Sequence, residues 1–245
     1  QSRPVALWAA KNGVKTVYTI VSDYAPGHDA ERQFIKDFTS KGGKIVKSIR
    51  IPLRTTDYAP FLENVLQAKP DALYIFMPAG PPSIATVNAW AKRGLKKAGI
   101  KLLATGEMQQ LYLPAVGDAA IGVVSSLHYT ETNQLPENLA MRKALTDLHG
   151  KGKEYIPDIA SVGAWDGMRL IYDAIAKLGP DFTGKQLIDF SRGREWKSPR
   201  GPMKIDAVER DVIQNFYLRR VVKKNGVLQN EDFDVIPMLK DPGKE

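Results

Sequence analysis

The sequence predicts an α/β fold, in which parallel strands alternate with helices through the first half of the chain and a differently built region follows. Between residues 14 and 128, short apolar and β-branched runs alternate with amphipathic segments of helical period. Strands that alternate with helices form parallel βαβ units with right-handed crossovers. After this region, three helical patterns are followed by strands that read as antiparallel.

The first elements show the pattern most clearly. The segment KTVYTIVS at 15–22 is β-branched, aromatic and apolar, and a turn signal bounds it, which predicts a buried strand. The segment at 29–43 places Phe34, Ile35 and Phe38 on one helical face and ends in glycines, as helices commonly do. The other elements expected in this half are strands at 44–52, 72–78, 100–105 and 122–129 and helices at 57–71 and 83–95.

The second half is predicted to contain helices and then a hairpin. Asn225-Gly226 has the composition of a two-residue hairpin turn. Trp165, near the start of a long amphipathic pattern, is more typical of packing than of function. The buried face of that helix is expected to comprise Ala164, Met168, Ile171, Tyr172 and Ile175. The expected helices cover 136–149, 159–178 and 183–191, and the expected strands cover 202–206, 214–222 and 227–236.

The composition argues against several functional classes. The 245 residues carry a formal net charge of +8, but Lys and Arg are scattered, which favours a solvated basic surface over nucleic-acid binding. Cysteine is absent, which excludes disulfides, thiolate metal sites and a cysteine nucleophile. No apolar run approaches the length of a membrane span, and the first residues do not read as a signal peptide. We therefore expect a mature form or a fragment.

Small and polar residues follow the predicted strands at their carboxyl ends, where ligands gather in open parallel sheets. Tyr24 follows the first strand, and it is expected either to cover the sheet edge or to line a pocket. Ala79 and Gly80 follow the third strand and would let a ligand approach the backbone closely. Glu107 follows the fourth strand, and we expect either a solvated loop carboxylate or an acceptor for a substrate ammonium.

The motifs for covalent chemistry and for phosphate binding are missing from the sequence. A phosphate loop needs several glycines, whereas Gly27 stands alone, and the G-x-S-x-G nucleophile elbow does not occur. Ser22, His28 and Asp29 are too crowded on one loop to align as a triad, and Asp29 is expected to cap the following helix. The histidines lack zinc spacing. We therefore predict a binding site with no catalytic residue, no metal and no cofactor.

Five blocks that follow one another along nearly the whole chain are similar to those of one protein family. They are VYTIVSDYAPGHDAERQFIKDFTSKGGKIV with its D-x-x-x-G loop, TTDYAPFLENVLQAKPDALYIF, GDAAIGVVSSLHY, GAWDGMRLIYDAI and SPRGPMKIDAVERDVIQNFYLRRV. In this order they resemble the type I periplasmic binding proteins of ABC importers, in the branch of the leucine/isoleucine/valine-binding proteins. Trp165 stands where that family usually has tyrosine.

The resemblance implies two α/β lobes joined by a three-stranded hinge, with a ligand in the cleft and closure of the hinge around it. It further implies that Glu107 matches the family's ammonium-binding glutamate. The residues that it places beside the ligand are Tyr24, Ala79, Gly80, Glu107 and Trp165.

The resemblance also implies a division of the chain. Residues 14–128 and 221–240 would form the carboxy-terminal lobe, and residues 129–220 the returning part of an incomplete amino-terminal lobe. Residues 1–13 would be the helix and linker that lead into the carboxy-terminal lobe. The amino-terminal half-lobe that this chain lacks would leave apolar surface uncovered.

The function that the resemblance implies is the solute-binding component of an ABC importer. Such a protein would capture a small carboxylate in the periplasm, such as a branched-chain or aromatic amino acid or an aromatic acid, and deliver it to a membrane permease. The alternative is a ligand-sensing receptor or regulatory domain of the same fold. An enzyme and a nucleic-acid partner are not expected.

Overall fold

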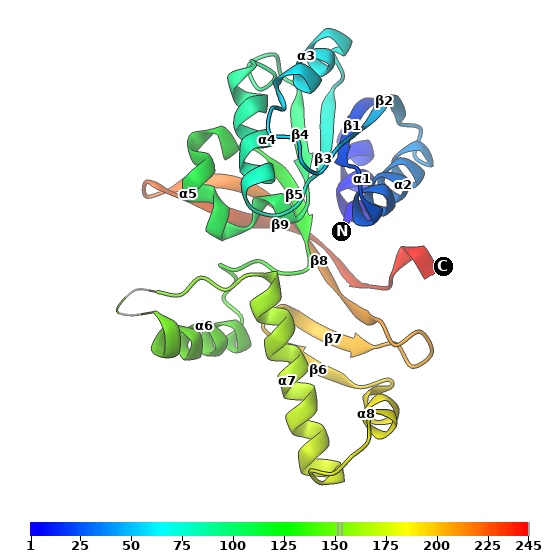
Figure 1. Ribbon diagram of the computed structural model, residues 1–245, viewed down its shortest axis with the longest axis vertical. Helices are drawn as coiled ribbons and strands as arrows, with labels where there is room; N and C mark the ends of the chain where they lie inside the picture. Colours follow the sequence, from blue (N-terminus) through cyan, green and yellow to red (C-terminus); the bar gives the residue numbers. More distant parts are fainter. Residues whose placement is uncertain (151, 153, 245) are drawn as a thin grey trace. The chain divides into compact units, whose positions relative to one another are not determined.

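The computed structural model describes residues 1–150, 152 and 154–244, and it divides into two compact units (Figure 1). Unit 1 consists of residues 1–127 and 217–234. Unit 2 consists of residues 128–216 and the segment that starts at Val235. The long strands β8 (Val212–Lys224) and β9 (Val227–Leu239) each contribute to both units.

Unit 1 is built on a mostly parallel sheet. Its strands lie in the order β2-β1-β3-β4-β5, with every neighbouring pair parallel, and the second part of β8 pairs antiparallel with β5. The parallel strands are β1 (Thr16–Ser22), β2 (Lys44–Ile51), β3 (Ala72–Phe76), β4 (Lys101–Ala104) and β5 (Val124–Leu127). This arrangement confirms the parallel α/β fold that the alternating pattern predicts.

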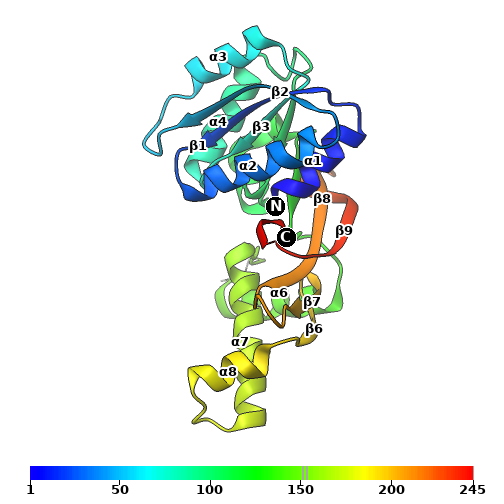
Figure 2. The same ribbon diagram turned by 90° about the vertical axis from the view of Figure 1, so that its right-hand side faces the viewer.

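Helices cover both faces of this sheet (Figures 1 and 2). On one face lie α1 (Ser2–Lys11) and α2 (Ala25–Thr39), and on the other lie α3 (Ala59–Ala68), α4 (Pro81–Lys92) and the short α5 (Leu113–Val116). The alternation of side chains along each strand supplies both cores. In β1, Val17 and Val21 are buried with residues of α1 and α2, whereas Tyr18 and Ile20 are buried with residues of α3 and α4. Because β1 is covered on both faces, apolar residues on both of its faces are buried.

Unit 2 combines three helices with antiparallel strands. β6 pairs with β7, and β7 pairs with the first part of β8. α7 begins after Asp158, whose side chain accepts a hydrogen bond of 2.7 Å from the N–H of Ser161, and α8 begins with a capping box of Thr183 and Gln186. The elements are α6 (Pro136–His149), α7 (Ile159–Leu178), α8 (Gly184–Ser191), β6 (Glu195–Ser198) and β7 (Gly201–Ile205).

In the second half of the chain, one local feature was predicted from the sequence and another was not. Asn225 and Gly226 have φ values of 50° and 80°, which confirms the predicted hairpin turn between β8 and β9. Strand β6 was not predicted, because its four residues, EWKS, are mostly polar and carry little strand signal. None of the helices in the described part of the chain is long and apolar enough to cross a membrane.

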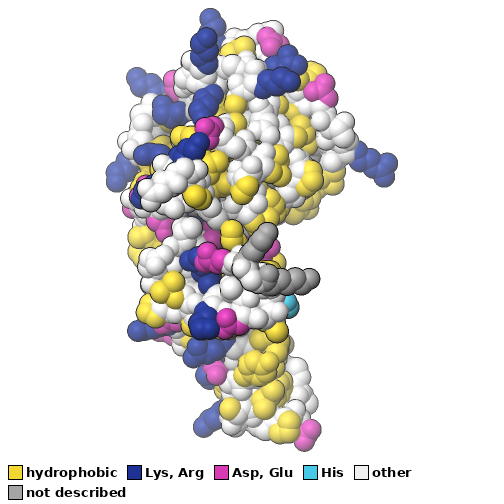
Figure 3. Space-filling model, turned by 90° about the vertical axis from the view of Figure 1, so that its left-hand side faces the viewer, with side chains coloured by type: hydrophobic (Ala, Val, Ile, Leu, Met, Phe, Trp, Pro, Cys, Tyr) yellow, Lys and Arg dark blue, Asp and Glu magenta, His cyan; other side chains and the backbone are white. Residues whose placement is uncertain are grey.

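The buried face of α7 differs from the prediction. Met168, Tyr172 and Ile175 are 42%, 62% and 40% exposed, and Figure 3 shows hydrophobic side chains gathered on the surface of this part of the molecule. Ala164 is exposed as well, and Ile171 is half-buried. The residues that α7 buries are instead Val162, Asp166 and Ala174. The helix presents two candidate stripes, and strand β6 contacts the one that contains Asp166 through Trp196 and Ser198.

Candidate functional site

The candidate site lies at the carboxyl edge of the parallel sheet of unit 1. There β1 ends at Ser22, β3 ends at Phe76 and β4 ends at Ala104. Because these strands are parallel neighbours, the segments that follow them emerge at the same edge. The predicted residues Tyr24, Ala79-Gly80 and Glu107 belong to these segments.

Glu107 links the ends of two neighbouring strands. It lies in a short 3₁₀ turn, Gly106–Met108, that follows β4, and only 1% of it is exposed. Its Oε1 accepts a hydrogen bond of 2.6 Å from the backbone N–H of Met77, the first residue after β3. Its Oε2 accepts hydrogen bonds from the backbone N–H of Thr105 (2.6 Å) and from the Thr105 hydroxyl (3.0 Å). The carboxylate thereby joins the backbones just beyond β3 and β4.

The surroundings of Glu107 act on its pKa in opposite directions. Burial raises the pKa because the charged carboxylate loses water, whereas the N–H groups of Met77 and Thr105 lower it by donating to the charged form. Burial prevails, so the pKa of Glu107 lies above its ordinary value. The first interpretation from the sequence, a solvated loop carboxylate, is wrong because the side chain is buried. The second, an acceptor for a ligand ammonium, stays a prediction.

Tyr24 is the second of the two residues between β1 and α2, and it is half-buried. Its ring lies 6.4 Å from the ring of Phe76 between centroids, at an angle of 37°. Burial raises the pKa of the Tyr24 hydroxyl, and the charge of Glu107 raises it further. At this edge Tyr24 and Phe76 therefore form an aromatic pair, and the charge of Glu107 acts on the hydroxyl of the tyrosine.

Ala79 and Gly80 form the connection from β3 to α4. Ala79 is exposed, and Gly80 is buried with φ of 95°, a conformation that residues with a β-carbon rarely adopt. The Ser83 hydroxyl donates a hydrogen bond of 2.7 Å to the carbonyl of Pro78. Because this connection follows Met77, its backbone is anchored at one end by Glu107 and at the other by α4.

The turn after β1 explains the polar residues around Gly27. His28 Nε2 lies 2.7 Å from Asp23 Oδ1, and Asp29 pairs with Arg32. Helix α2 begins at Ala25, so the prediction that Asp29 caps this helix is wrong, because the first turn starts before it. The Ser22 hydroxyl donates to the sulfur of Met77 at 3.3 Å. Ser22, His28 and Asp29 therefore have three separate partners and do not align as a triad.

Trp165 belongs to unit 2, on the exposed side of α7, where 36% of it is exposed. It borders a hollow of about 510 Å³ between α6 and α7. Most of its lining is apolar or aromatic, and the polar residues that line it are His149, Ser161 and Arg169. Trp165 thus lines a surface hollow of its own unit, and its predicted ligand contact stays a prediction.

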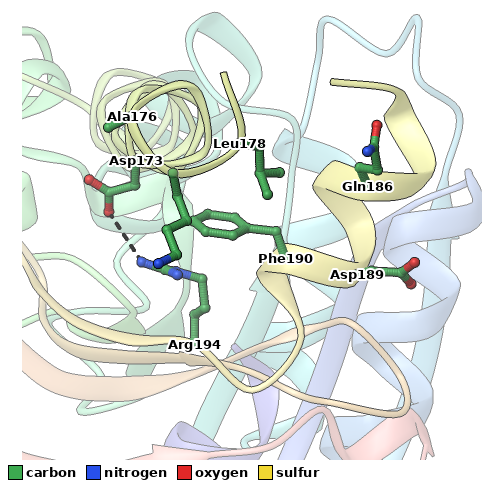
Figure 4. Close-up of a pocket in the computed structure, with 8 residues that line it drawn as sticks. Asp173, Ala176, Leu178, Gln186, Asp189, Phe190 and Arg194 are labelled. Carbon is green, nitrogen blue, oxygen red and sulfur yellow. Dashed lines mark ion pairs between the residues drawn. The ribbon is translucent and has the colours of Figure 1, made fainter. Parts of the chain in front are cut away.

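A second hollow of unit 2, about 660 Å³ in volume, lies between α7 and α8 (Figure 4). The guanidinium of Arg194 lies 3.9 Å from the ring centroid of Phe190 and 3.8 Å from the carboxylate of Asp173. These groups point toward one another, so the charge of Arg194 is balanced within the hollow. Among the described residues, no group of three or more His, Asp or Glu side chains could hold a metal ion.

Sequence reasoning did not identify the contacts that Met77, Thr105 and Phe76 make at the edge of unit 1. Met77 and Thr105 act mainly through backbone N–H groups, which carry no signal in the residue type. Phe76 was treated as part of a continuous apolar strand, and only its place at the strand end brings it to Tyr24. The order of the strands could have suggested that the three segments meet, but not which atoms bind.

Comparison with known proteins identifies a family and relatives to which this chain is similar. The family described as periplasmic binding protein matches residues 1–226. A relative from Brucella melitensis, named Leu/Ile/Val-binding protein homolog 6, is 38% identical over 244 residues, which are 99% of this chain and 62% of the relative. The chain thus spans less than two thirds of the length of this relative.

Solved structures of solute-binding proteins are also similar to this chain. A solute-binding protein of an ABC transporter from Rhodopseudomonas palustris BisB5, in complex with 3,4-dihydroxybenzoic acid, is 41% identical with a TM-score of 0.92, covering 100% of this chain and 66% of that one. A solute-binding protein of an ABC transporter from Rhodopseudomonas palustris HaA2, in complex with p-hydroxybenzoic acid, is 38% identical with a TM-score of 0.93. That match covers 99% of this chain and 66% of the other.

Proposed function

The chain belongs to the periplasmic binding protein family, and on that premise we propose that it is part of the solute-binding component of an ABC importer that captures a small aromatic carboxylate. The ligand would be bound in the periplasm and delivered to a membrane permease. The two Rhodopseudomonas palustris proteins support this ligand class, because both are similar to this chain over nearly all of its length and both are complexes with hydroxylated benzoic acids. Capture of this kind requires no covalent chemistry.

The ligand class is inferred from the burial and the hydrogen bonds of Glu107, the one carboxylate predicted to contact the ligand. An amino-acid ligand brings an ammonium group, which needs an accessible carboxylate or carbonyl acceptor. Glu107 is 1% exposed, and both of its oxygens already accept short hydrogen bonds from the protein. An aromatic acid needs no such acceptor, and its ring fits the aromatic pair of Tyr24 and Phe76.

Binding of an aliphatic amino acid is the competing possibility, since the Brucella relative is named for leucine, isoleucine and valine. For Glu107 to receive an ammonium, its carboxylate would have to be uncovered, since only 1% of the residue is exposed. Uncovering it would disturb the hydrogen bonds that it accepts from the N–H groups of Met77 and Thr105. The burial of Glu107 therefore favours an amine-free acid.

Ligand-observed NMR on this chain tests the proposal, because saturation transfer detects weak binding. We expect signals for 4-hydroxybenzoate, 3,4-dihydroxybenzoate and benzoate, and weaker ones or none for leucine, isoleucine and valine. Tyr24→Ala should weaken binding of the aromatic acids by about ten-fold, or about 1.4 kcal/mol. Leu148→Ala, which removes an exposed apolar side chain of unit 2 outside the hollow of Trp165, is the control. Binding of the amino acids alone, or binding that Tyr24→Ala leaves unchanged, would contradict the proposal.

A further inference from the structure

The paired segment of β3 and β4 ends before the edge of the sheet. Its residue pairs run from Ala72–Lys101 to Tyr74–Leu103. Met77 lies three residues beyond the last pair on β3, and Thr105 lies two residues beyond it on β4. At these positions the carboxylate of Glu107 accepts one backbone N–H from each strand, both at 2.6 Å. A side chain thus joins the two strands where their own ladder has ended.

The hydrogen bonds of this link are of a kind that holds the Glu107 side chain in one position. Hydrogen bonds from N–H groups to a carboxylate are shorter and stronger than bonds between neutral groups, and the 2.6 Å distances fit this class. The Thr105 hydroxyl adds a third donor at 3.0 Å. Because Glu107 is buried, water does not compete for its oxygens. The side chain is therefore held on both sides and holds both backbones in return.

We propose that Glu107 is a positioning residue, which sets the spacing of the segments after β3 and β4. Its carboxylate binds these segments and does not serve as an acceptor for the amino group of a ligand. It acts on the ligand through the backbone from Met77 to Gly80 and does not touch it. Selection against amino acids follows, since an amine brought to this edge would be desolvated without gaining a carboxylate. This inference deepens the proposed function and rests on it only for the ligand measurements.

Two variants separate positioning from direct binding. Glu107→Gln keeps the size of the side chain but turns one acceptor into an NH₂ donor that faces an N–H group. Glu31→Gln makes the same change at another glutamate of unit 1, which is 5% exposed and accepts hydrogen bonds from Arg50. Glu31 lies in α2, away from the link between β3 and β4. It is therefore the matched control.

The first measurement is amide hydrogen exchange. The N–H groups of Met77 and Thr105 should exchange at least about ten-fold faster in Glu107→Gln, which corresponds to about 1.4 kcal/mol, and at the wild-type rate in Glu31→Gln. In the wild-type chain the ¹H–¹⁵N signals of both amides should move together with one pKa above the ordinary pKa of glutamate, because one carboxylate serves both. This titration needs no variant, so it decides the matter even where Glu107→Gln does not fold. Independent titration, or unchanged exchange, would overturn the inference.

The second measurement uses two ligands that differ only by an amine, 3-phenylpropanoate and L-phenylalanine. We expect Glu107→Gln to weaken both by the same factor, so that their affinity ratio is that of the wild type. A loss of about ten-fold for phenylalanine alone, about 1.4 kcal/mol, would show that Glu107 binds the ammonium and would overturn the inference. If the wild-type chain binds no acid at all, the proposed function fails, whereas the exchange and titration results still decide the positioning role.

Discussion

A β-carbon placed on Gly27 would lie 2.1 Å from the carbonyl oxygen of Ser22, far closer than such atoms approach in proteins. The first turn of α2 therefore packs directly on the end of β1, and only a residue without a side chain fits there. The lone glycine of the polar turn serves this close approach. It brings Tyr24, which lies between the two residues, to the edge of the sheet.

Replacing Gly27 with alanine should destabilise the chain by about 1–3 kcal/mol, because α2 must shift away from β1 to admit the methyl group. Urea unfolding followed by circular dichroism measures this change. The control is Gly167→Ala in α7, where nothing lies within 4 Å of an added β-carbon. That variant should be neutral or more stable by about 0.5–1 kcal/mol. Wild-type stability of Gly27→Ala would contradict the close contact.

The buried carboxylate of Asp166 ties α7 to β6 and the turn after it. It accepts hydrogen bonds from the Arg200 guanidinium (2.9 Å), the Ser198 hydroxyl (2.8 Å) and the Trp196 indole (3.1 Å). Asp166→Ala should cost about 3–5 kcal/mol, because a buried arginine loses its carboxylate. Urea unfolding monitored by tryptophan fluorescence, to which Trp165 and Trp196 of this unit contribute, measures the change.

The matched control for Asp166 is an exposed ion pair of the same unit. Asp147 pairs with Lys143 at 2.6 Å, with both side chains more than half exposed. Asp147→Ala should change stability by less than about 1 kcal/mol. Equal effects of the two substitutions would show that burial of Asp166 does not matter.

Asp206 should make unit 2 sensitive to acid. Its ion pair with Lys240 (2.9 Å) and the N–H groups of Glu209 and Val208 lower the pKa of Asp206 from its usual 3.8 to about 2. A pKa depressed by folding contributes stability above the unfolded value, and this contribution is lost as the pH falls through the folded value. The stability difference between wild type and Asp206→Asn should thus be constant above about pH 4 and shrink toward pH 2.

Chemical denaturation at a series of pH values between 2 and 7 checks this expectation. Lys240→Met removes the first of the three causes, so it should reduce the pH dependence in the same direction. Parallel stability curves for wild type and Asp206→Asn would show that the pKa of Asp206 is not lowered by folding.

The exposed side of α7 should accept charge without loss of stability. Met168 and Tyr172 are 42% and 62% exposed, so Met168→Lys and Tyr172→Lys should each change the free energy of unfolding by about 0.5 kcal/mol or less. Both should lower the fluorescence of a dye that binds apolar surfaces. Val162→Lys, at a fully buried position of the same helix, should prevent stable folding of unit 2. Strong destabilisation by the first two variants would contradict the exposure of this face.

The candidate site shows which of its features could be predicted from residue patterns and which could not. Tyr24 and Glu107 could be selected because polar residues that follow buried parallel strands meet at one edge of a sheet. The two sequence-based alternatives for Glu107 could not be separated, since nothing in the residue type says that both oxygens accept N–H groups from Met77 and Thr105. Those donors belong to the backbone, and their places depend on how β3 and β4 run past the end of their ladder.

Residue patterns were enough to predict the alternation of strands and helices, the parallel sheet and the hairpin at Asn225-Gly226, because local periodicity and turn chemistry act within a few residues. The buried face of α7 and the hydrogen bonds of Glu107 depend instead on packing between distant segments. An amphipathic helix has more than one stripe that can pack. The stripe of Val162 and Asp166 is buried because Tyr129 and Met141 pack with Val162 and residues of β6 bind Asp166. Burial of a carboxylate likewise depends on donors from segments distant in sequence, which only the folded chain brings together.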